Sequence, residues 1–201
     1  MLRMALVRPG ATNFDEQGRI KGTLDIPLSE RGAAQADVAA SELRGLGLEV
    51  VYCSPCQPAT ETAERIAEQA DAKVKRLEKL HNVDQGLWQG KRIEEIRQGQ
   101  PRAYHRWRDD PDAVCPPGGE TVADARHRVK KALDKICKKH KKGSIALVTP
   151  EPLASLIRNH LLNDNAVEDL WEAECERGQW ELFELNGEVA ISCASTARSD
   201  R

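Results

Sequence analysis

The sequence predicts an α/β fold of three layers, α/β/α, in which helices cover both faces of a mostly parallel sheet. Three short apolar runs, at residues 4–8, 49–53 and 144–149, are expected to be strands. Segments with helical periodicity alternate with these runs, which is typical of such a sheet. In sheets of this kind, binding sites lie outside the carboxyl ends of the strands.

The expected helices cover residues 30–46, 57–69, 122–141 and 152–162. In the first, several apolar residues lie close to one face and predict a buried side, namely Ala33, Ala36, Val38, Ala40, Leu43 and Leu46. The longest, residues 122–141, begins after Thr121, which with Asp124 resembles a capping box. Residues 179–185 and 188–194 are expected to form a hairpin around Asn186-Gly187, followed by a frayed tail at 195–201.

Composition limits the classes of protein that fit this chain. Its 201 residues are enough for one core, and we expect one domain over residues 1–201. The net charge of -2 gives no general attraction to nucleic acid or membranes. No secretory signal is recognised, no apolar stretch approaches the roughly 18 residues of a membrane span, and six cysteines are scattered. We therefore expect a reduced, cytoplasmic protein.

A set of ordered motifs carries a family resemblance. Residues 5–12 read Ala-Leu-Val-Arg-Pro-Gly-Ala-Thr, and residues 18–32 contain Gly-Arg-Ile-Lys-Gly and Asp-Ile-Pro-Leu-Ser. Residues 54–63, 80–90, 117–120 and 145–150 continue the series. Together these blocks resemble the histidine phosphatase superfamily, whose members are phosphoglycerate mutase-like. The resemblance implies that fold. It also implies phosphoryl transfer to the histidine within the motif Leu-Val-Arg-His-Gly-Glu-Thr.

The chain departs from this pattern at the positions to which the resemblance assigns chemistry. Pro9 stands where the nucleophilic histidine is implied, Pro58 where a phosphate-binding arginine is implied, and Asn82 where the proton-donating glutamate is implied. Pro150 replaces the second histidine, and Glu151 follows it. Since phosphoryl transfer needs a nucleophile, a cationic clamp and an acid, the sequence predicts no catalytic residue of the implied kind.

Several polar residues remain near the predicted crevice. Arg8, Arg19 and Lys21 keep positive charge there, and we expect them to bind a ligand together with Asp15, His81 and Glu120. His81 adjoins Asn82 and is a candidate surrogate for the missing acid. A small anion therefore remains a possible ligand. No metal or other cofactor is expected, since no histidine pair has metal-ligand spacing.

Two further patterns suggest other functions. Cys53 and Cys56 have the CxxC spacing of a redox or metal pair, although a buried core cysteine is the commoner meaning. The basic run at residues 138–142 could contact nucleic acid, but cations at a helix C-terminus also favour the helix dipole, and we expect no nucleic-acid partner.

The first functional hypothesis is a catalytically inactive pseudophosphatase that binds a small anionic ligand or a protein partner, with its oligomeric state open. The alternative is a phosphatase-like or mutase-like enzyme that acts on a phosphorylated small molecule through non-standard pocket residues. A redox or structural role of Cys53 and Cys56 is the third hypothesis.

Overall fold

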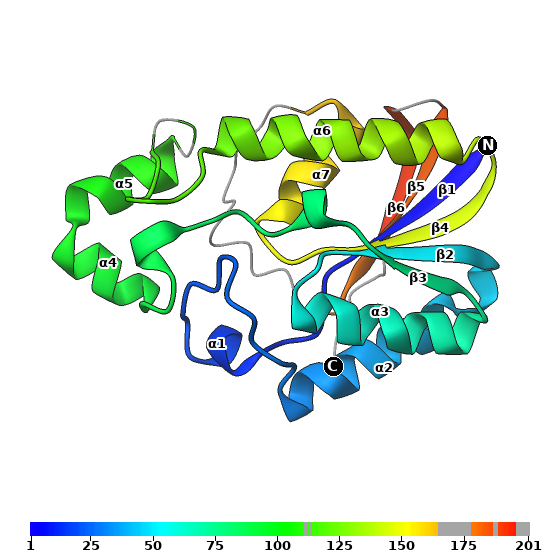
Figure 1. Ribbon diagram of the computed structural model, residues 1–201, viewed down its shortest axis with the longest axis horizontal. Coiled ribbons are helices and arrows are strands. Elements are labelled where there is room, and N and C mark those ends of the chain that lie inside the picture. The colour runs from blue at the N-terminus through cyan, green and yellow to red at the C-terminus, as the bar shows by residue number, and fades with distance from the viewer. Residues whose placement is uncertain (111, 113, 165–177, 187–188, 196–201) are drawn as a thin grey trace.

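The computed structural model describes residues 1–110, 112, 114–164, 178–186 and 189–195, and of residues 189 and 191–195 it describes the backbone alone. Its centre is a six-stranded sheet in the order β3-β2-β4-β1-β5-β6 (Figure 1). The strands are β1 (Leu2–Val7), β2 (Leu48–Cys53), β3 (Lys73–Arg76), β4 (Gly143–Val148), β5 (Trp180–Asn186) and β6 (Val189–Ser195). The first four are parallel to one another. Strand β5 pairs antiparallel with β1, and β6 pairs antiparallel with β5.

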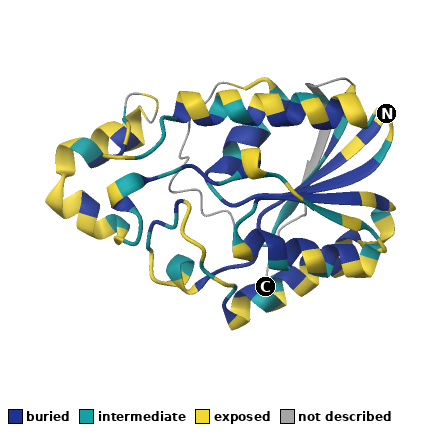
Figure 2. Ribbon diagram, in the orientation of Figure 1, coloured by how far each residue is buried: buried dark blue, intermediate teal, exposed yellow. Residues whose placement is uncertain are grey.

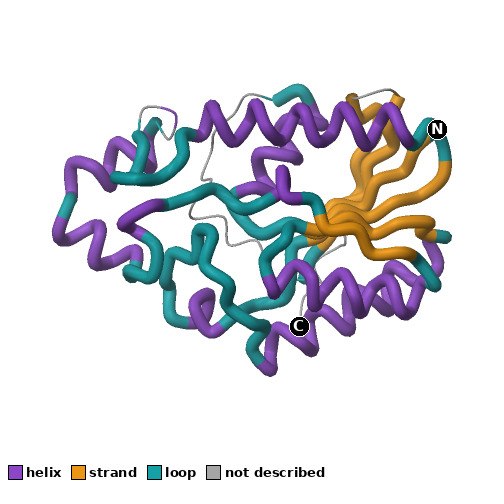
Figure 3. The backbone as a smooth tube through the Cα atoms, in the orientation of Figure 1, coloured by secondary structure: helices purple, strands orange, loops and turns teal. Residues whose placement is uncertain are grey.

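Helices cover both faces of the sheet (Figures 1 and 3). One face carries α2 (Glu30–Leu43) and α3 (Gln57–Ala70), and the other carries α6 (Val122–Lys139) and α7 (Leu153–Leu162). The shorter elements are α1 (Asn13–Glu16), α4 (Ile93–Gly99), α5 (Pro101–Asp109) and the 3₁₀ turns η1 (Arg44–Leu46), η2 (Glu78–Leu80) and η3 (Gly86–Trp88). The predicted three-layer α/β/α fold is confirmed.

The central strands are apolar throughout because both of their faces are covered. In β1, Met4 and Leu6 belong to the hydrophobic cluster under α6 and α7, whereas Ala5 and Val7 belong to the cluster under α2 and α3. The neighbouring strand β4 alternates in the same way, and its Val148 lies beside Val7. The period of two residues therefore sends successive side chains into two different cores. In Figure 2 the central strands are coloured mostly as buried.

A third hydrophobic cluster lies beyond the carboxyl ends of the parallel strands. It joins α4 and α5 to the loops that follow β1 and β3, and its buried members are Ile20, Trp88, Ile96, Tyr104 and Trp107. The rings of Trp88 and Trp107 meet edge to face, with centroids 5.3 Å apart. This cluster, which we did not predict, supports the loop that contains Ile20.

Most expected elements occur within two residues of their predicted bounds, and several details differ. The helix expected over 30–46 ends as an α-helix at Leu43, and its Val38 is 58% exposed, so that residue was wrongly assigned to the buried face. Thr121 is the N-cap of α6, and its hydroxyl accepts a hydrogen bond from the Asp124 amide. The Asp124 carboxylate accepts from the Thr121 hydroxyl and not from the Thr121 backbone amide, so the predicted capping box is incomplete. The hairpin is present, although residues 187–188 and most of the expected tail, 196–201, lie outside the described residues.

Among the described helices, none combines the length and the apolar character needed to cross a bilayer.

The loop after β1 packs against the start of α2 without space for a side chain. A Cβ atom added to Gly32 would lie 1.8 Å from the Ala11 carbonyl oxygen. We therefore predict that Gly32→Ala lowers the free energy of unfolding by about 1–3 kcal/mol, measured by urea denaturation. Gly45→Ala is the matched control, because nothing lies within 4 Å of the added atom. Equal unfolding midpoints for the two variants would contradict this packing.

Candidate functional site

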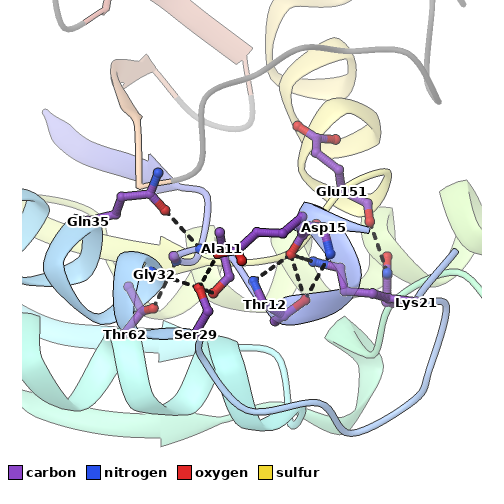
Figure 4. Close-up of polar contacts among 12 residues, drawn as sticks. Ala11, Thr12, Asp15, Lys21, Ser29, Gly32, Gln35, Thr62 and Glu151 are labelled. Carbon is purple, nitrogen blue, oxygen red and sulfur yellow. Dashed lines mark hydrogen bonds and ion pairs between the residues drawn. The ribbon is translucent and has the colours of Figure 1, made fainter. Parts of the chain in front are cut away.

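The loop after β1 is held by side chains from the neighbouring helices. The backbone amide of Gly10 donates to Thr62 Oγ1 at 3.2 Å, and that of Ala11 donates to Gln35 Oε1 at 2.9 Å (Figure 4). Pro9 has no backbone N–H. The amides of residues 9–11 therefore do not form an open cradle for a phosphate.

Asp15 and Lys21, which come after this loop in the sequence, form an ion pair (Figure 4). Thr12 precedes α1 as its N-cap and forms a full capping box with Asp15. Asp15 Oδ2 accepts from the Thr12 amide, the Thr12 hydroxyl and Lys21 Nζ, each at 2.7 Å. Both side chains of the ion pair are at most 10% exposed. Three hydrogen bonds from Thr12 and Lys21 thus fix the carboxylate in place, and the Asp15 amide donates a fourth to the Thr12 hydroxyl.

This ion pair lies in the wall of a cavity of about 80 Å³. Residues 15–22, the third hydrophobic cluster with its surroundings, and the segment after β4 all contribute to the wall. The lining residues are Asp15, Arg19, Ile20, Lys21, Gly22, Gln85, Ile93, Trp107, Glu151 and Pro152. Three of the expected ligand-binding residues, Asp15, Arg19 and Lys21, therefore lie together.

Two buried amides beside the cavity have unsatisfied polar atoms. Gln85 is 1% exposed, and neither its Oε1 nor its Nε2 has a hydrogen-bond partner among the residues that the structure describes. Asn82 Nδ2 donates to the carbonyl oxygens of Gly22 and Glu151, two residues that line the cavity. Within the described part of the chain, Asn82 Oδ1 has no hydrogen-bond partner. Since a buried polar group without a partner costs about 1–3 kcal/mol, such groups need an explanation, and a bound ligand is one.

Arg8 does not line the cavity but contacts a residue that does. Its Nε donates to Glu151 Oε1 at 2.6 Å, and its Nη1 donates to Glu181 Oε1 at 2.9 Å. Arg158 Nε donates to the other oxygen of Glu181 at 2.9 Å. Burial raises the pKa of Glu181, but the hydrogen bonds from Arg8 and Arg158 outweigh burial and hold this pKa below its ordinary value. Two carboxylates thus compensate the buried Arg8 guanidinium.

The four positions at which the family pattern loses its implied catalytic or phosphate-binding residues are buried. Pro9 and Pro150 follow β1 and β4, which are adjacent in the sheet, and Pro58 lies in the first turn of α3. Asn82 contacts the segment after β4, because its Nδ2 donates a hydrogen bond to the Glu151 carbonyl oxygen. The cavity wall includes Glu151 but none of these four residues.

Two of the expected site residues lie elsewhere. The ring of His81 contacts the backbone carbonyl of Asn82 through Nδ1 at 2.8 Å, and His81 is absent from the cavity wall. Glu120 accepts two hydrogen bonds from Arg128, at 2.6 and 2.8 Å. Arg19, by contrast, lies in the wall and donates through Nη1 to the Gly90 carbonyl.

Neither cysteine of the CxxC pair has an activated thiol. Burial raises the pKa of Cys53 to about 11, and burial also raises the pKa of Cys56. A thiolate is the reactive form, so both thiols are protonated and inert at neutral pH. Among the residues that the structure describes, no cluster of three or more metal-ligating side chains occurs.

Gln85 and Glu181 are site residues that sequence analysis missed. Gln85 lies in one of the family-like blocks, at a position that the motif leaves open. Glu181 lies in β5 opposite Leu6. The sequence signal that could have identified Glu181 is a charged residue within a strand that pairs with the central strand β1.

The sequence comparison decides the family. A model of the histidine phosphatase superfamily (branch 1) matches residues 4–191. The chain belongs to this superfamily. Phosphoserine phosphatase 1 of Hydrogenobacter thermophilus is 35% identical over 149 residues, which are 74% of this chain and 71% of that protein. Adenosylcobalamin/alpha-ribazole phosphatase of Escherichia coli is 24% identical over 189 residues, 94% of this chain and 93% of that protein.

Solved structures of the superfamily share the fold. Phosphoserine phosphatase of Entamoeba histolytica, in complex with 3-phosphoglyceric acid, superposes with a TM-score of 0.83 at 24% identity and covers 98% of both chains. Mycobacterial glucosyl-3-phosphoglycerate phosphatase, in complex with VO₃, has a TM-score of 0.85 at 23% identity and covers 97% of both chains.

These comparisons contradict the hypothesis of a catalytically inactive protein, because the relatives are named as phosphatases. The hypothesis rested on the implied roles of Pro9, Pro58, Asn82 and Pro150. It gave no weight to the cavity beside them, where Asp15 and Lys21 form a fixed ion pair.

The buried charge network predicts a pH-dependent stability. Because the pKa of Glu181 is depressed in the folded chain, its contribution is present above its unfolded pKa, about 4.3, and is lost as the pH falls through the folded pKa. Glu181→Gln should lower the free energy of unfolding at pH 7 by about 1.5–3 kcal/mol. That deficit should shrink below about pH 4 in urea titrations.

The control for this prediction is Glu64→Gln, which removes an exposed ion pair with Arg76. It should change stability by less than about 0.5 kcal/mol. A deficit of Glu181→Gln that stays constant from pH 7 to pH 3 would contradict the role of this ionised carboxylate.

Proposed function

We propose that the chain hydrolyses phosphate monoesters of small polar molecules in the cavity beside Asp15 and Lys21. The observation that carries this proposal is the wall of that cavity, where two cationic side chains, a fixed carboxylate and an unsatisfied buried amide meet. Membership of the histidine phosphatase superfamily and the names of the relatives support it.

The cations of the wall suit a phosphoryl group. Lys21 and Arg19 bring positive charge to the cavity, and Lys21 is held by its ion pair with Asp15. Arg8 is compensated by two carboxylates, and the amides of Gly10 and Ala11 are bound to side chains. A phosphate placed by Lys21 and Arg19 therefore does not need to displace these contacts.

The hydrolytic step needs a nucleophile other than the residue at position 9. Pro9 and Pro150 stand where the resemblance implies histidines, and proline has no group that attacks phosphorus or exchanges a proton. We assign the attack to water. Asp15 takes a proton from the water, the water oxygen bonds to phosphorus, the ester P–O bond breaks, and the leaving oxygen receives the proton from Asp15.

The size of the cavity limits the part of the substrate that it holds. About 80 Å³ is far below the roughly 300–1,000 Å³ of pockets that enclose drug-sized ligands. We propose that it holds the phosphoryl group, with the rest of the molecule at the mouth. One relative is named for phosphoserine, which is a small molecule, and the other for adenosylcobalamin and alpha-ribazole.

We also propose that residues 1–201 form one domain and that the chain works in the cytoplasm. One sheet separates the two large hydrophobic clusters, and the four described cysteines are free, which suits a reducing compartment.

The first catalytic prediction concerns Asp15. Wild-type protein should hydrolyse p-nitrophenyl phosphate and O-phosphoserine, and Asp15→Asn should lower kcat by about 10²–10⁴, since it removes a general base and keeps the shape of the side chain. Released phosphate is the measured quantity, with circular dichroism to verify folding.

Lys91→Ala is the matched control, because Lys91 is exposed, lies near Ile20 and is not part of the cavity wall. Its rate should equal that of the wild type. No hydrolysis by the wild type, or an unchanged rate in Asp15→Asn, would refute the proposed mechanism.

The second catalytic prediction concerns Gln85. Gln85→Met keeps the length of the side chain and removes both unsatisfied polar atoms, so the free energy of unfolding should stay equal or rise by about 1 kcal/mol. KM should rise about tenfold, which corresponds to about 1.4 kcal/mol of lost binding. A variant that loses stability and keeps its KM would show that Gln85 serves the fold alone.

A further inference from the structure

A second, larger hollow lies away from the catalytic cavity and shares no residue with it. This groove has a volume of about 340 Å³ and is bordered by the edge strand β3, the turn η2 and helix α6. Its volume falls in the range of roughly 300–1,000 Å³ that is typical of small-molecule sites.

The floor of the groove is apolar. Leu77 and Ile136 belong to the hydrophobic core under α6, and Ala132 lies one helical turn before Ile136. Tyr52 also lines the groove, and its hydroxyl is hydrogen-bonded to His140 Nε2 at 2.8 Å. The floor therefore suits an apolar body with no hydrogen-bonding groups.

Four lysines surround this floor. Lys135 and Lys139 are one turn apart on α6 and flank Ile136, while Lys75 and Lys79 come from β3 and η2. In β3, Val74 packs under α3, so the alternation of the strand turns Lys75 toward the face that carries α6. Glu78 is the one carboxylate among the described residues that line the groove.

The positive charge of the rim is not neutralised locally. Hydrogen bonding to Lys139 and repulsion from its ammonium lower the pKa of Lys75. Within the described parts of the chain, no carboxylate forms an ion pair with any of the four lysines. Hydrogen bonding to Lys75, together with the nearby Tyr52, raises the pKa of Lys139. An anion beside these two side chains would favour the charged form of both.

We propose that this groove binds a small amphiphilic anion. Its apolar chain or ring would lie on Leu77, Ala132 and Ile136, and its anionic head would lie between Lys75 and Lys139. Charge complementarity and the apolar floor together select this class, because an inorganic anion would leave the floor in water and a neutral hydrocarbon would leave the ammonium groups unpaired. The site is independent of the proposed hydrolysis.

The test uses octane-1-sulfonate, which has an eight-carbon chain and a head that no phosphatase can hydrolyse. Isothermal titration calorimetry on the full chain should show one site, and Lys75→Glu with Lys139→Glu should weaken binding at least tenfold. The matched control is Lys131→Glu with Lys138→Glu, which makes the same charge change on exposed residues outside the groove and should keep wild-type affinity.

A second variant tests the floor without changing charge. Ala132→Leu should fill part of the groove and weaken octane-1-sulfonate binding, while circular dichroism reports whether the chain is folded. Inorganic sulfate should bind at least tenfold more weakly than octane-1-sulfonate.

Absence of binding to the wild type, equal affinity in all charge variants, or equal affinity for sulfate would overturn the proposal. Loss of binding in Lys21→Ala, with the groove variants unaffected, would place the ligand in the catalytic cavity and would also overturn it.

Discussion

The buried guanidinium of Arg8 is the constraint on which the site depends. Its side chain is 4% exposed at the end of the central strand β1, and an unpaired charge there would cost several kcal/mol. Glu151 from the segment after β4 and Glu181 from β5 compensate it, and Arg158 of α7 extends the network. The ion pairs around Arg8 therefore connect the ends of β1, β4 and β5 with helix α7.

This compensation determines where an incoming phosphate can lie. With Arg8 held by two carboxylates and the amides of Gly10 and Ala11 bonded to Thr62 and Gln35, the loop after β1 acts as a structural support. The charges of Arg19 and Lys21 remain at the cavity. Asp15 holds Lys21 there and at the same time caps α1, so the fold and the proposed chemistry use the same carboxylate.

Hydrophobic periodicity predicted the fold well because the central strands and the long helices have faces that are buried throughout. Strand β1 and helix α6 are examples. Periodicity missed β3, whose sequence Lys-Val-Lys-Arg has one apolar residue, and it missed α4 and α5, which bury only a few large side chains such as Trp107. It misplaced Val38 because the buried face of α2 is made of glycine and alanine beside Leu43, and the exposed face carries the larger residue.

The site was predicted less completely than the fold. The family resemblance led us to expect Asp15, Arg19 and Lys21 near the crevice, and all three line the cavity. It could not show that Arg8 is compensated, because Glu181 is far away in the sequence and its partner is set by the register of β5 against β1. Nor could it show that Gln85 is buried without a partner, since burial depends on how the third cluster packs.

The most direct measurement of the central claim is a crystal structure of the chain with orthovanadate, a mimic of the phosphoryl group in transfer. The vanadium is expected in the cavity, with its oxygens within hydrogen-bonding distance of Lys21 and Arg19, and with the contacts of Arg8 to Glu151 and Glu181 unchanged. Vanadate bound to Arg8, with those two carboxylates displaced, would contradict the proposed site.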